Sequence, residues 1–435
     1  METSEPEPPD PGEKNAHRFV FFRAIADQIV FGAPLYVYAK SLGASATVMG
    51  IIASFMPLMS LTQMAGAKYL ERHSYRNFAL MGQNSRVVFS LLIASIPLLF
   101  FLSPSVKLAI LLFAIFGVNL SRLTLTIAWM PWMTAVIPGE RRGHFLSINH
   151  LFTVLGSLTF LLVAGSVMYG EPVSWKYTVI FALSGVGALL SQYFLRRIPE
   201  AIAAESSQSS HPVPWGAMLR YRPFAKVLIL NLLWVGTLGS FDAFRISFLR
   251  EQQNLSPTNV LFLAAFSFIG AALVLPYTSR ILDRVGSKPM LQIACLLYIA
   301  PIIVWFLMAA EVMPCTYWSP AFLYTSTGAG WGIFTVANNR ALMATIPKMG
   351  RNHFFALYSL VFGISMGITP IAWGMILDAL RNVDITTGAL HWKRYSIYFF
   401  GLLVLNILAF FQVYLLEEAP QPGNRRKPAQ ASPAG

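Results

Sequence analysis

Long apolar runs separated by short polar links cover almost the whole chain. Most runs are about 20 residues long or longer, and a helix that rises 1.5 Å per residue crosses a bilayer core of about 30 Å over that length. Twelve such runs are predicted to be membrane-spanning helices, at 19–39, 46–69, 77–102, 105–136, 144–168, 176–197, 222–249, 257–281, 289–311, 319–346, 353–380 and 394–416. The links leave no room for a soluble catalytic domain, so we do not expect an enzyme.

Two short patterns recur at an offset close to half the chain. The pattern Ile-Pro-x-x-x-Arg-x-His-Phe occurs at 137–145 and again, 209 residues later, at 346–354. An acid followed by Arg, with a second base four residues further on, occurs at 71–76 and again, 212 residues later, at 283–288. A duplicated set of membrane segments is typical of secondary transporters, whose substrate site lies between the repeats near the bilayer midplane.

The duplication divides the chain into predicted parts. A polar stretch with several Ser and Pro residues lies near the middle and is expected to be a flexible cytoplasmic linker. The predicted parts are an N-terminal tail at 1–18, a six-helix bundle at 19–197, the linker at 198–221, a second six-helix bundle at 222–416 and a C-terminal tail at 417–435.

Composition and charge agree with a membrane protein. Of the 435 residues, 55% are hydrophobic and 12% are charged, and the mean hydropathy is +0.57. These values lie far outside the range of soluble domains. With the N-terminus inside, the tails and links on the inner side hold 20 of the Lys and Arg residues and the outer links hold seven. This bias predicts that both termini are cytoplasmic. The net charge of +13 then reflects loops that face lipid headgroups, so nucleic acid is not an expected partner.

Sequence motifs give no support for a hydrolase, an ATP-driven pump or a metal site. The chain contains no HExxH or GxxxxGK[ST] motif, and its GxSxG match at 363–367 falls inside a predicted span instead of at a strand-to-helix turn, which argues against hydrolase chemistry and ATP-driven pumping. Cys295 falls in a predicted span and Cys315 in a link, so neither a disulfide framework nor a metal site is expected. We expect no cofactor and a monomeric protein. Its expected partners are membrane lipids, a small-molecule substrate and, for coupling, protons. No cleavable signal peptide is recognisable, which favours a bacterial inner membrane.

The chain resembles the major facilitator superfamily over residues 19–416. The resemblance rests on the two six-span halves, on the Pro-x-x-x-Arg link after the fourth span of each half, and on the loop after the second span. The family pattern of this loop is Gly-x-x-x-Asp-Arg-x-Gly-Arg-Lys. Residues 279–288 match it except at the first Gly and the first base, and residues 67–76 keep the acid and two bases but lose both glycines. The resemblance implies an all-α membrane fold of twelve helices in two pseudo-symmetric bundles, and transport by alternating access.

The loops that carry the resemblance also contain candidate gating residues. An acid at one helix end, near a basic link, forms an ion pair when that side is shut and loses it when the halves rock apart. The resemblance implies this latch role, and the alternative is that the charges only enforce topology. The candidates are Glu71, Arg72, Arg76, Arg142, Asp283, Arg284, Lys288 and Arg351.

Arg122, near the middle of the fourth span, is the first candidate substrate residue. Charge within the bilayer is costly and marks functional sites. Helical periodicity places Asn119, Thr126 and Trp129 on the same face. An Arg at this depth suits an anionic group through charge-assisted hydrogen bonds, so this face is assigned to substrate binding. The alternative is a structural ion pair with a buried acid such as Asp27 or Asp242.

The seventh span carries a second polar face. Asp242 and Arg245 are three residues apart and close enough to pair. They either neutralise each other, or Asp242 takes a proton, or Arg245 binds substrate as Asp242 releases it. Arg23 and Asp27 in the first span pose the same choice. We assign coupling to Asp27 and Asp242, with the proton as the expected ion. The candidate substrate residues of the second half are Asn231, Trp234, Phe241, Arg245 and Asn339.

The predicted function is secondary active transport of a small solute, best described as an organic anion or zwitterion, with possible proton coupling. One alternative is efflux of amphipathic or cationic compounds. The family's drug antiporters carry a Gly-rich run after an Arg in the fourth span, whereas Arg122 is followed by Leu-Thr-Leu-Thr. A second alternative is a transport-dead membrane sensor or scaffold. Gly363-x-x-x-Gly367-x-x-Pro370-x-x-x-Gly374 in the eleventh span predicts a hinge or tight helix packing.

Overall fold

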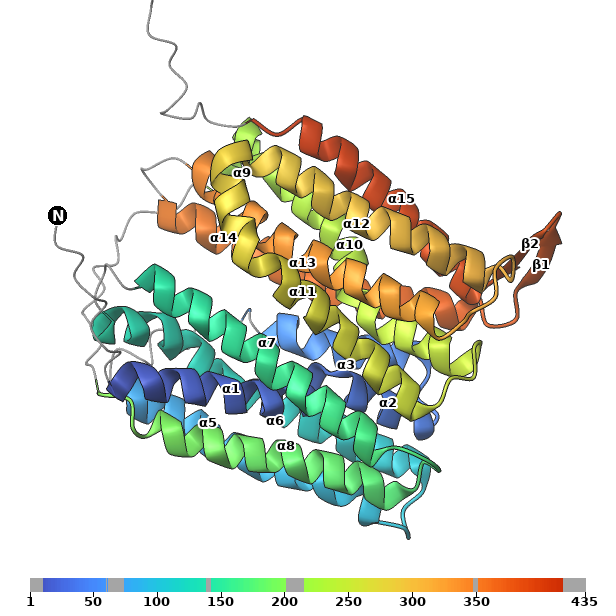
Figure 1. Ribbon diagram of the computed structural model, residues 1–435, viewed down its shortest axis with the longest axis horizontal. Helices are drawn as coiled ribbons and strands as arrows, with labels where there is room; N and C mark the ends of the chain where they lie inside the picture. The colour runs from blue at the N-terminus through green and yellow to red at the C-terminus, as the bar shows by residue number, and fades with distance from the viewer. Residues whose placement is uncertain are drawn as a thin grey trace, which may run out of the picture.

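Two helical lobes lie side by side in the computed structural model, which describes residues 11–59, 61, 74–137, 142–200, 215–346 and 351–417. The first lobe is drawn blue to green in Figure 1 and the second yellow-green to red. The helices of the first lobe are α1 (Pro11–Phe31), α2 (Ala33–Ser41), α3 (Ala46–Met59), α5 (Tyr75–Ser95), the 3-10 turn η2 (Ile96–Leu98), α6 (Pro104–Val136), α7 (Arg142–Val167) and α8 (Ser174–Leu195).

The second lobe repeats this arrangement and adds a small hairpin. Its elements are α9 (Trp215–Arg220), α10 (Arg222–Glu251), α11 (Pro257–Val285), α12 (Ser287–Ala309), α13 (Trp318–Thr345), α14 (Arg351–Ala379), β1 (Asp384–Thr387), β2 (Leu390–Lys393) and α15 (Arg394–Tyr414). The two strands pair antiparallel, with Asp384 opposite Lys393.

The described part of each of the twelve predicted apolar runs coincides with a helix or with a helix that is broken once. Ten of the described helices are long and apolar enough to cross a membrane. The other two runs correspond to α3, which is described only as far as Met59, and to α13, which is long but more polar. The predicted all-α fold of two pseudo-symmetric six-helix bundles is therefore confirmed. The domain boundaries around 198–221 stay a prediction, because residues 201–214 lie outside the described part of the chain.

The break in the first span separates α1 from α2 at Gly32. The backbone N–H of Gly32 donates to the carbonyl of Gln28, and a Cβ on Gly32 would overlap Gln28. Pro34 then occupies the first turn of α2, where its missing N–H costs nothing. The break leaves Phe31, the last residue of α1, beside the centre of the first lobe.

The two ends of the molecule differ in which chain segments they carry. One end carries the hairpin, and we call it the hairpin end (right in Figure 1). The start of α1 and the end of α15 lie at the opposite end, which we call the terminal end. Because each full-length span crosses from one end to the other, residues near the middle of a span lie midway between the two ends.

The lobes pack against each other through α3 with α14 and through α7 with α11. Small residues allow the close approach. A Cβ added to Gly50 of α3 would overlap the carbonyl of Pro370, and one added to Gly374 of α14 would meet the carbonyl of Ala46. Gly367 faces Leu58 in the same way. The glycine pattern of the eleventh span therefore serves tight helix packing between the lobes.

Polar contacts between the lobes reinforce the hairpin end. Both carboxylate oxygens of Asp378, on α14, accept backbone N–H groups of α3, from Ala46 at 3.0 Å and from Thr47 at 2.8 Å. Lys40 forms an ion pair with Glu251 at the end of α10. The Thr258 hydroxyl donates to the Met168 carbonyl at 2.8 Å. The interlobe hydrogen bonds and ion pairs of the described residues thus cluster at the hairpin end, which is closed.

Candidate functional site

Three arginines surround one aspartate at the centre of the first lobe. Arg86 Nη2 lies 2.7 Å from Asp27 Oδ1, Arg122 Nη2 lies 3.3 Å from Oδ2, and Arg23 Nε lies 3.7 Å from Oδ2. We call these four residues the arginine cluster. They come from three helices: Arg23 and Asp27 are one turn apart on α1, Arg86 lies midway along α5, and Arg122 lies midway along α6.

The arginine cluster is almost completely enclosed by protein. Arg86 is fully buried, and the side chains of Arg23, Asp27 and Arg122 are 17%, 12% and 11% exposed. Five of its guanidinium nitrogens are buried without a hydrogen-bond partner among the described residues: Nε of Arg23, Nε and Nη1 of Arg86, and Nε and Nη1 of Arg122. A buried donor without a partner costs free energy. The site therefore has unused capacity to donate to an acceptor that enters it.

The charges of the arginine cluster do not balance. Asp27 contributes one negative charge, whereas its three arginine neighbours contribute three positive charges. Phe31 partly compensates, because its ring lies 4.8 Å from the Arg122 guanidinium carbon and attracts the cation. Burying an ion costs several kcal/mol unless it is paired. The excess of two cations makes the cluster attractive to an anion.

Asp242 and Arg245 form a charged centre on α10 in the second lobe. The Arg245 guanidinium pairs with Asp242 and donates to the hydroxyls of Thr327 and Ser267, both at 3.2 Å. Its guanidinium carbon also lies 3.6 Å from the centre of the Tyr324 ring. Arg245 is buried, but the Asp242 side chain is 63% exposed. This centre is neutral, and its acid is accessible.

Aromatic rings and amides fill the rest of the second lobe's interior. Trp234 is buried and stacks on Phe334 with ring centres 3.8 Å apart, and Phe241 lies against Arg245 and is buried too. Asn231 exchanges hydrogen bonds with Asn338 at 2.9 and 3.0 Å. Trp234, Phe241 and Asn231 were predicted to line a substrate face. In this conformation the structure places them inside the lobe, where they pack helices together.

The predicted face of the fourth span is only partly brought together. Arg122 reaches Asp27, but Asn119 is buried one turn away and donates to the Ile115 carbonyl of its own helix at 2.9 Å. Thr126 is exposed and donates to the Arg122 carbonyl at 3.1 Å. Trp129 packs on Phe19 with ring centres 4.9 Å apart. Of the alternatives for Arg122, pairing with Asp27 is present in the structure, and pairing with Asp242 is not among the described contacts.

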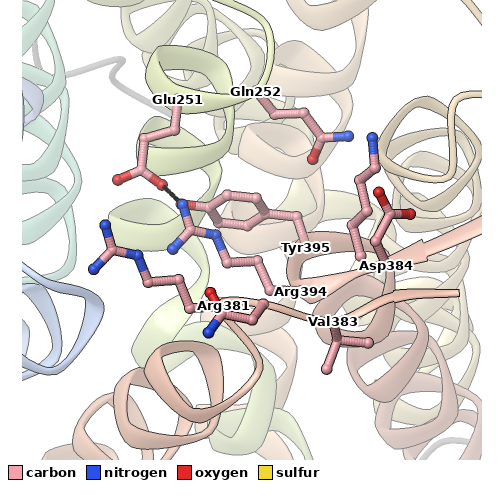
Figure 2. A pocket seen from close by; sticks show the side chains of 9 residues that line it. Glu251, Gln252, Arg381, Val383, Asp384, Arg394 and Tyr395 are labelled. Carbon is pink, nitrogen blue, oxygen red and sulfur yellow. Dashed lines mark hydrogen bonds and ion pairs between the residues drawn. The ribbon is translucent and has the colours of Figure 1, made fainter.

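A cavity of 280 Å³ opens at the hairpin end of the second lobe, against the interlobe contact. Figure 2 shows that Arg394 and Tyr395 converge there on Glu251. Arg394 lies 2.5 Å from the Glu251 carboxylate, which also accepts from Tyr395 and pairs with Lys40 of the first lobe. Glu251 is nine residues from Asp242, or about 14 Å along the helix. The cavity is thus part of the closed hairpin end and separate from both polar centres.

Comparison with known proteins agrees with this architecture. The model of the Major Facilitator Superfamily matches residues 19–337 and, in a second match, 246–434. The chain belongs to the Major Facilitator Superfamily. As a member it is an integral, multi-pass membrane protein and a secondary transporter, not an enzyme.

Solved structures of other transporters share the fold of this superfamily member. A mutant of the nucleoside transporter NupG superimposes with a TM-score of 0.70 at 13% identity, covering 94% of this chain and 100% of that chain. The inward-open xylose transporter XylE from E. coli gives 0.64 at 15% identity, covering 95% and 96%. Monosaccharide-sensing protein 3 of Arabidopsis thaliana is 30% identical over 140 residues, which are 28% of this chain and 18% of that protein. These identities support the fold and leave the substrate open.

Three candidate gating residues of this superfamily member are described with their side chains, and these three lie at the terminal end. Arg76 pairs with Glu200 at 2.9 Å, within the first lobe. Arg284 is exposed, and Lys288 Nζ lies 3.5 Å from the Tyr414 carbonyl. Glu71 and Arg72, and the side chains of Arg142, Asp283 and Arg351, lie outside the described part of the structure. The latch therefore stays a prediction.

Sequence reasoning missed Arg86 and Asn338, which both make buried polar contacts, and Asn339 stays a predicted substrate residue. Arg86 lies inside the third apolar run, so the rule that flagged Arg122 applies equally to it. Asn339 is exposed, whereas Asn338 is buried and bonds both Asn231 and the Tyr358 hydroxyl. The signal for Asn338 was weak, because two adjacent asparagines differ by 100° around a helix and the wheel has no absolute reference.

Proposed function

We propose that the protein transports a small organic anion by alternating access, with the arginine cluster as the anion-binding part of its site. The observation that carries the proposal is the cluster of three buried arginines around the single carboxylate of Asp27. Guanidinium groups bind carboxylates and phosphates through paired, charge-assisted hydrogen bonds. The Nε and Nη1 atoms of Arg86 and Arg122, which have no partner among the described residues, supply the donors.

The second lobe contributes differently in this proposal. Arg245 is neutralised by Asp242 and held by two hydroxyls and a tyrosine ring, so it has little attraction left for an anion. Asp242 is the better candidate for proton coupling, because it is accessible and has one cationic neighbour. Asp27 has three, and nearby cations stabilise the ionised form of a carboxylate. We therefore assign proton coupling to Asp242 and anion binding to the first lobe.

We further propose that the hairpin end faces outward and both termini face the cytoplasm of a bacterial cell. The excess of basic residues on the terminal side supports this orientation. The closed hairpin end then corresponds to an inward-facing conformation. In the outward-facing conformation the interlobe bonds of Asp378 and Lys40 break, and the predicted latch of Glu71, Asp283 and their basic neighbours closes the terminal end.

Two alternative functions, efflux of cationic compounds and ligand sensing without transport, predict different results from anion transport. Efflux of cationic compounds conflicts with the arginine cluster, because a cation is repelled by two uncompensated positive charges. A sensor that binds a ligand without transporting it is consistent with the same anion site. Binding and transport must therefore be measured separately.

The decisive test is a ligand screen on the purified full-length protein in detergent. Thermal unfolding is recorded with carboxylates, phosphate esters, amino acids, organic cations and sugars, for wild type and for Arg122→Ala. A ligand of the folded state stabilises it by about 2.7 kcal/mol at a hundredfold excess over Kd. We expect anions to stabilise wild type and not the variant. Lys107→Ala is the matched control, because Lys107 lies on the same helix, α6, at the hairpin end.

Ligands from the screen are then tested for counterflow in proteoliposomes. Anions that bind and exchange support the transporter proposal. Anions that bind without exchange support the sensor alternative. Stabilisation by cations or sugars that is equal in wild type and Arg122→Ala contradicts the anion proposal.

A further inference from the structure

The arginine cluster constrains the number of charges on the substrate as well as their sign. We infer that the substrate presents two negative charges to the first lobe, as two carboxylates or one phosphate monoester, and that Arg86 sets this preference. The inference rests on the proposed function, because it concerns the same anion site. It goes further in naming a charge class and a specificity-determining residue that the sequence did not reveal.

The count of two follows from the groups that face the cluster. Arg23 and Arg122 each interact with Asp27 as their acidic neighbour and with other arginines of the cluster as cationic neighbours. Asp27 in turn interacts with all three arginines. Within the described chain, these interactions leave three positive charges against one negative charge. A monoanion leaves one buried cation unpaired, whereas a dianion makes the site neutral, and an unpaired buried charge is costly.

The donors of the cluster are also sufficient for a dianion. Asp27 already occupies Nη2 of Arg86 and Nη2 of Arg122. The remaining Nε and Nη1 atoms of these two arginines are buried and without partners among the described residues. Each negatively charged group accepts more than one N–H, and paired bonds from Arg suit both carboxylate and phosphate oxygens. Four donors on two arginines therefore match an anion with several acceptor oxygens.

Arg86 is the residue that raises the excess to two. It is fully buried on α5, it makes the shortest contact to Asp27, and two of its nitrogens have no partner in the described structure. If Arg86 were absent, Arg23 and Arg122 would exceed Asp27 by a single charge, which a monoanion balances. The second lobe does not change this count, because Arg245 and Asp242 cancel each other.

The experiment compares ligands that differ in charge but little in shape. Methyl phosphate and methyl sulfate form one pair, and succinate and monomethyl succinate form the other. At pH 7.5 a phosphate monoester is mostly doubly charged, because its second pKa is about 6. Thermal shifts of the full-length protein give an apparent Kd for each probe. For wild type we expect the dianion of each pair to bind about tenfold more tightly or better, since one further opposite charge is engaged in a poorly hydrated site.

Variants then test the role of Arg86. In Arg86→Gln we expect the preference for the dianion to disappear, with monoanions bound as well or better. Arg86→Lys keeps the charge and should keep the preference. Arg23→Gln lowers the same charge excess from a more exposed position, and so it tests the count if Arg86→Gln does not fold. Lys107→Gln, at the far end of α6, should bind both pairs as wild type does.

The outcomes separate this inference from the proposed function. If mono- and dianions bind wild type equally and Arg122→Ala abolishes both, the anion site stands and the charge count is wrong. If no organic anion binds, both are wrong. If sodium chloride alone stabilises wild type but not Arg122→Ala, and no probe displaces the chloride, a resident inorganic ion balances the cluster and the inference of a dianionic substrate is overturned. Loss of the preference in Arg86→Gln together with its retention in Arg86→Lys supports the inference.

Discussion

Each lobe contains an ion pair between Asp and Arg, but the two acids differ in exposure and in the number of neighbouring arginines. In the first lobe Asp27 is enclosed by three arginines, and in the second Asp242 is exposed beside one. The two acids lie 215 residues apart on the first span of each half, close to the offsets of 209 and 212 between the sequence repeats. The duplication has therefore kept an acid in a comparable place and changed what surrounds it.

The two lobes differ in residue type at equivalent positions of the repeat. With the offset of 212 residues of the loop that precedes it, Arg86 corresponds to Tyr298, and with the offset of 209 residues of the motif that ends the fourth span, Arg122 corresponds to Trp331. Tyr298 is buried against Trp234, and the Trp331 ring lies 6.0 Å from that of His150. Where the first lobe has cations, the second lobe has aromatic packing. The comparison indicates a division of labour, in which one lobe attracts the charged group of the substrate and the other supplies an acid that can exchange protons.

The largest expected difference between the lobes concerns the loss of each acid. Asp27→Asn leaves three buried cations without an acid, and removing one partner of a buried ion pair costs about 3–5 kcal/mol. Asp242→Asn leaves Arg245 with Thr327, Ser267 and the Tyr324 ring, and its exposed carboxylate was screened by solvent, so we expect about 1 kcal/mol or less. Thermal unfolding in detergent measures both. Equal losses would contradict the difference between the two centres.

A second comparison separates packing from binding within the second lobe. Asn338→Ala removes the hydrogen bonds to Asn231 and to the Tyr358 hydroxyl, which keep their bond to each other at 2.8 Å, and each buried hydrogen bond contributes about 0.5–1.5 kcal/mol. Asn339→Ala changes an exposed side chain and should alter stability by less than about 0.5 kcal/mol. The two variants differ by one residue in position, so each controls the other in the same thermal assay. A larger effect of Asn339→Ala on ligand binding than on stability would support its predicted place in the substrate site.

A third prediction concerns the contact that both lobes share. Asp378 caps the first turn of α3 across the lobe interface, and loss of such a cap costs about 0.5–2 kcal/mol. In Asp378→Ala we expect the amides of Ala46 and Thr47 to exchange hydrogen about tenfold faster, because the hairpin end opens more often. Hydrogen exchange measured by mass spectrometry follows this peptide, and Asp384→Ala in the hairpin is the control. Unchanged exchange would mean that glycine packing alone closes this end.

The sequence was sufficient for the fold because the bilayer imposes a length and a polarity on each span. It was sufficient for Arg122 for the same reason, since a charge inside an apolar run is visible without a structure. It was insufficient to predict which side chains contact Arg122. A helical wheel groups Thr126 and Trp129 with this arginine, but the rotation of α6 against its neighbours decides which side chain meets Asp27.

The contact between Arg86 and Asp27 joins residues 59 positions apart in sequence, and no local pattern encodes it. The same holds for the contact between Asp378 and α3, which joins residues more than 300 positions apart. Tertiary packing produces both contacts. The apolar pattern fixes which helices exist and how long they are, whereas the polar partners depend on how six helices pack in each lobe.

Among the substitutions of acidic residues, the smallest loss of stability is expected for an ion pair outside both centres. This loss is the reference against which the loss at Asp27 is judged. Lys393 donates to Glu311 at 2.6 Å near the hairpin, and this hydrogen bond lowers the pKa of Glu311 and raises that of Lys393. A carboxyl group with a lowered pKa stabilises the folded state above its ordinary pKa, and this contribution is lost as pH falls through the folded value. At pH 7 Glu311→Gln should therefore lower stability by less than about 1 kcal/mol, since the pair is exposed. Once pH has fallen below the lowered pKa of Glu311 in the folded state, the variant and wild type should unfold at the same temperature. A difference that persists at low pH would mean that Glu311 acts through packing, and a loss at pH 7 as large as that of Asp27→Asn would remove burial as the reason why the arginine cluster is special.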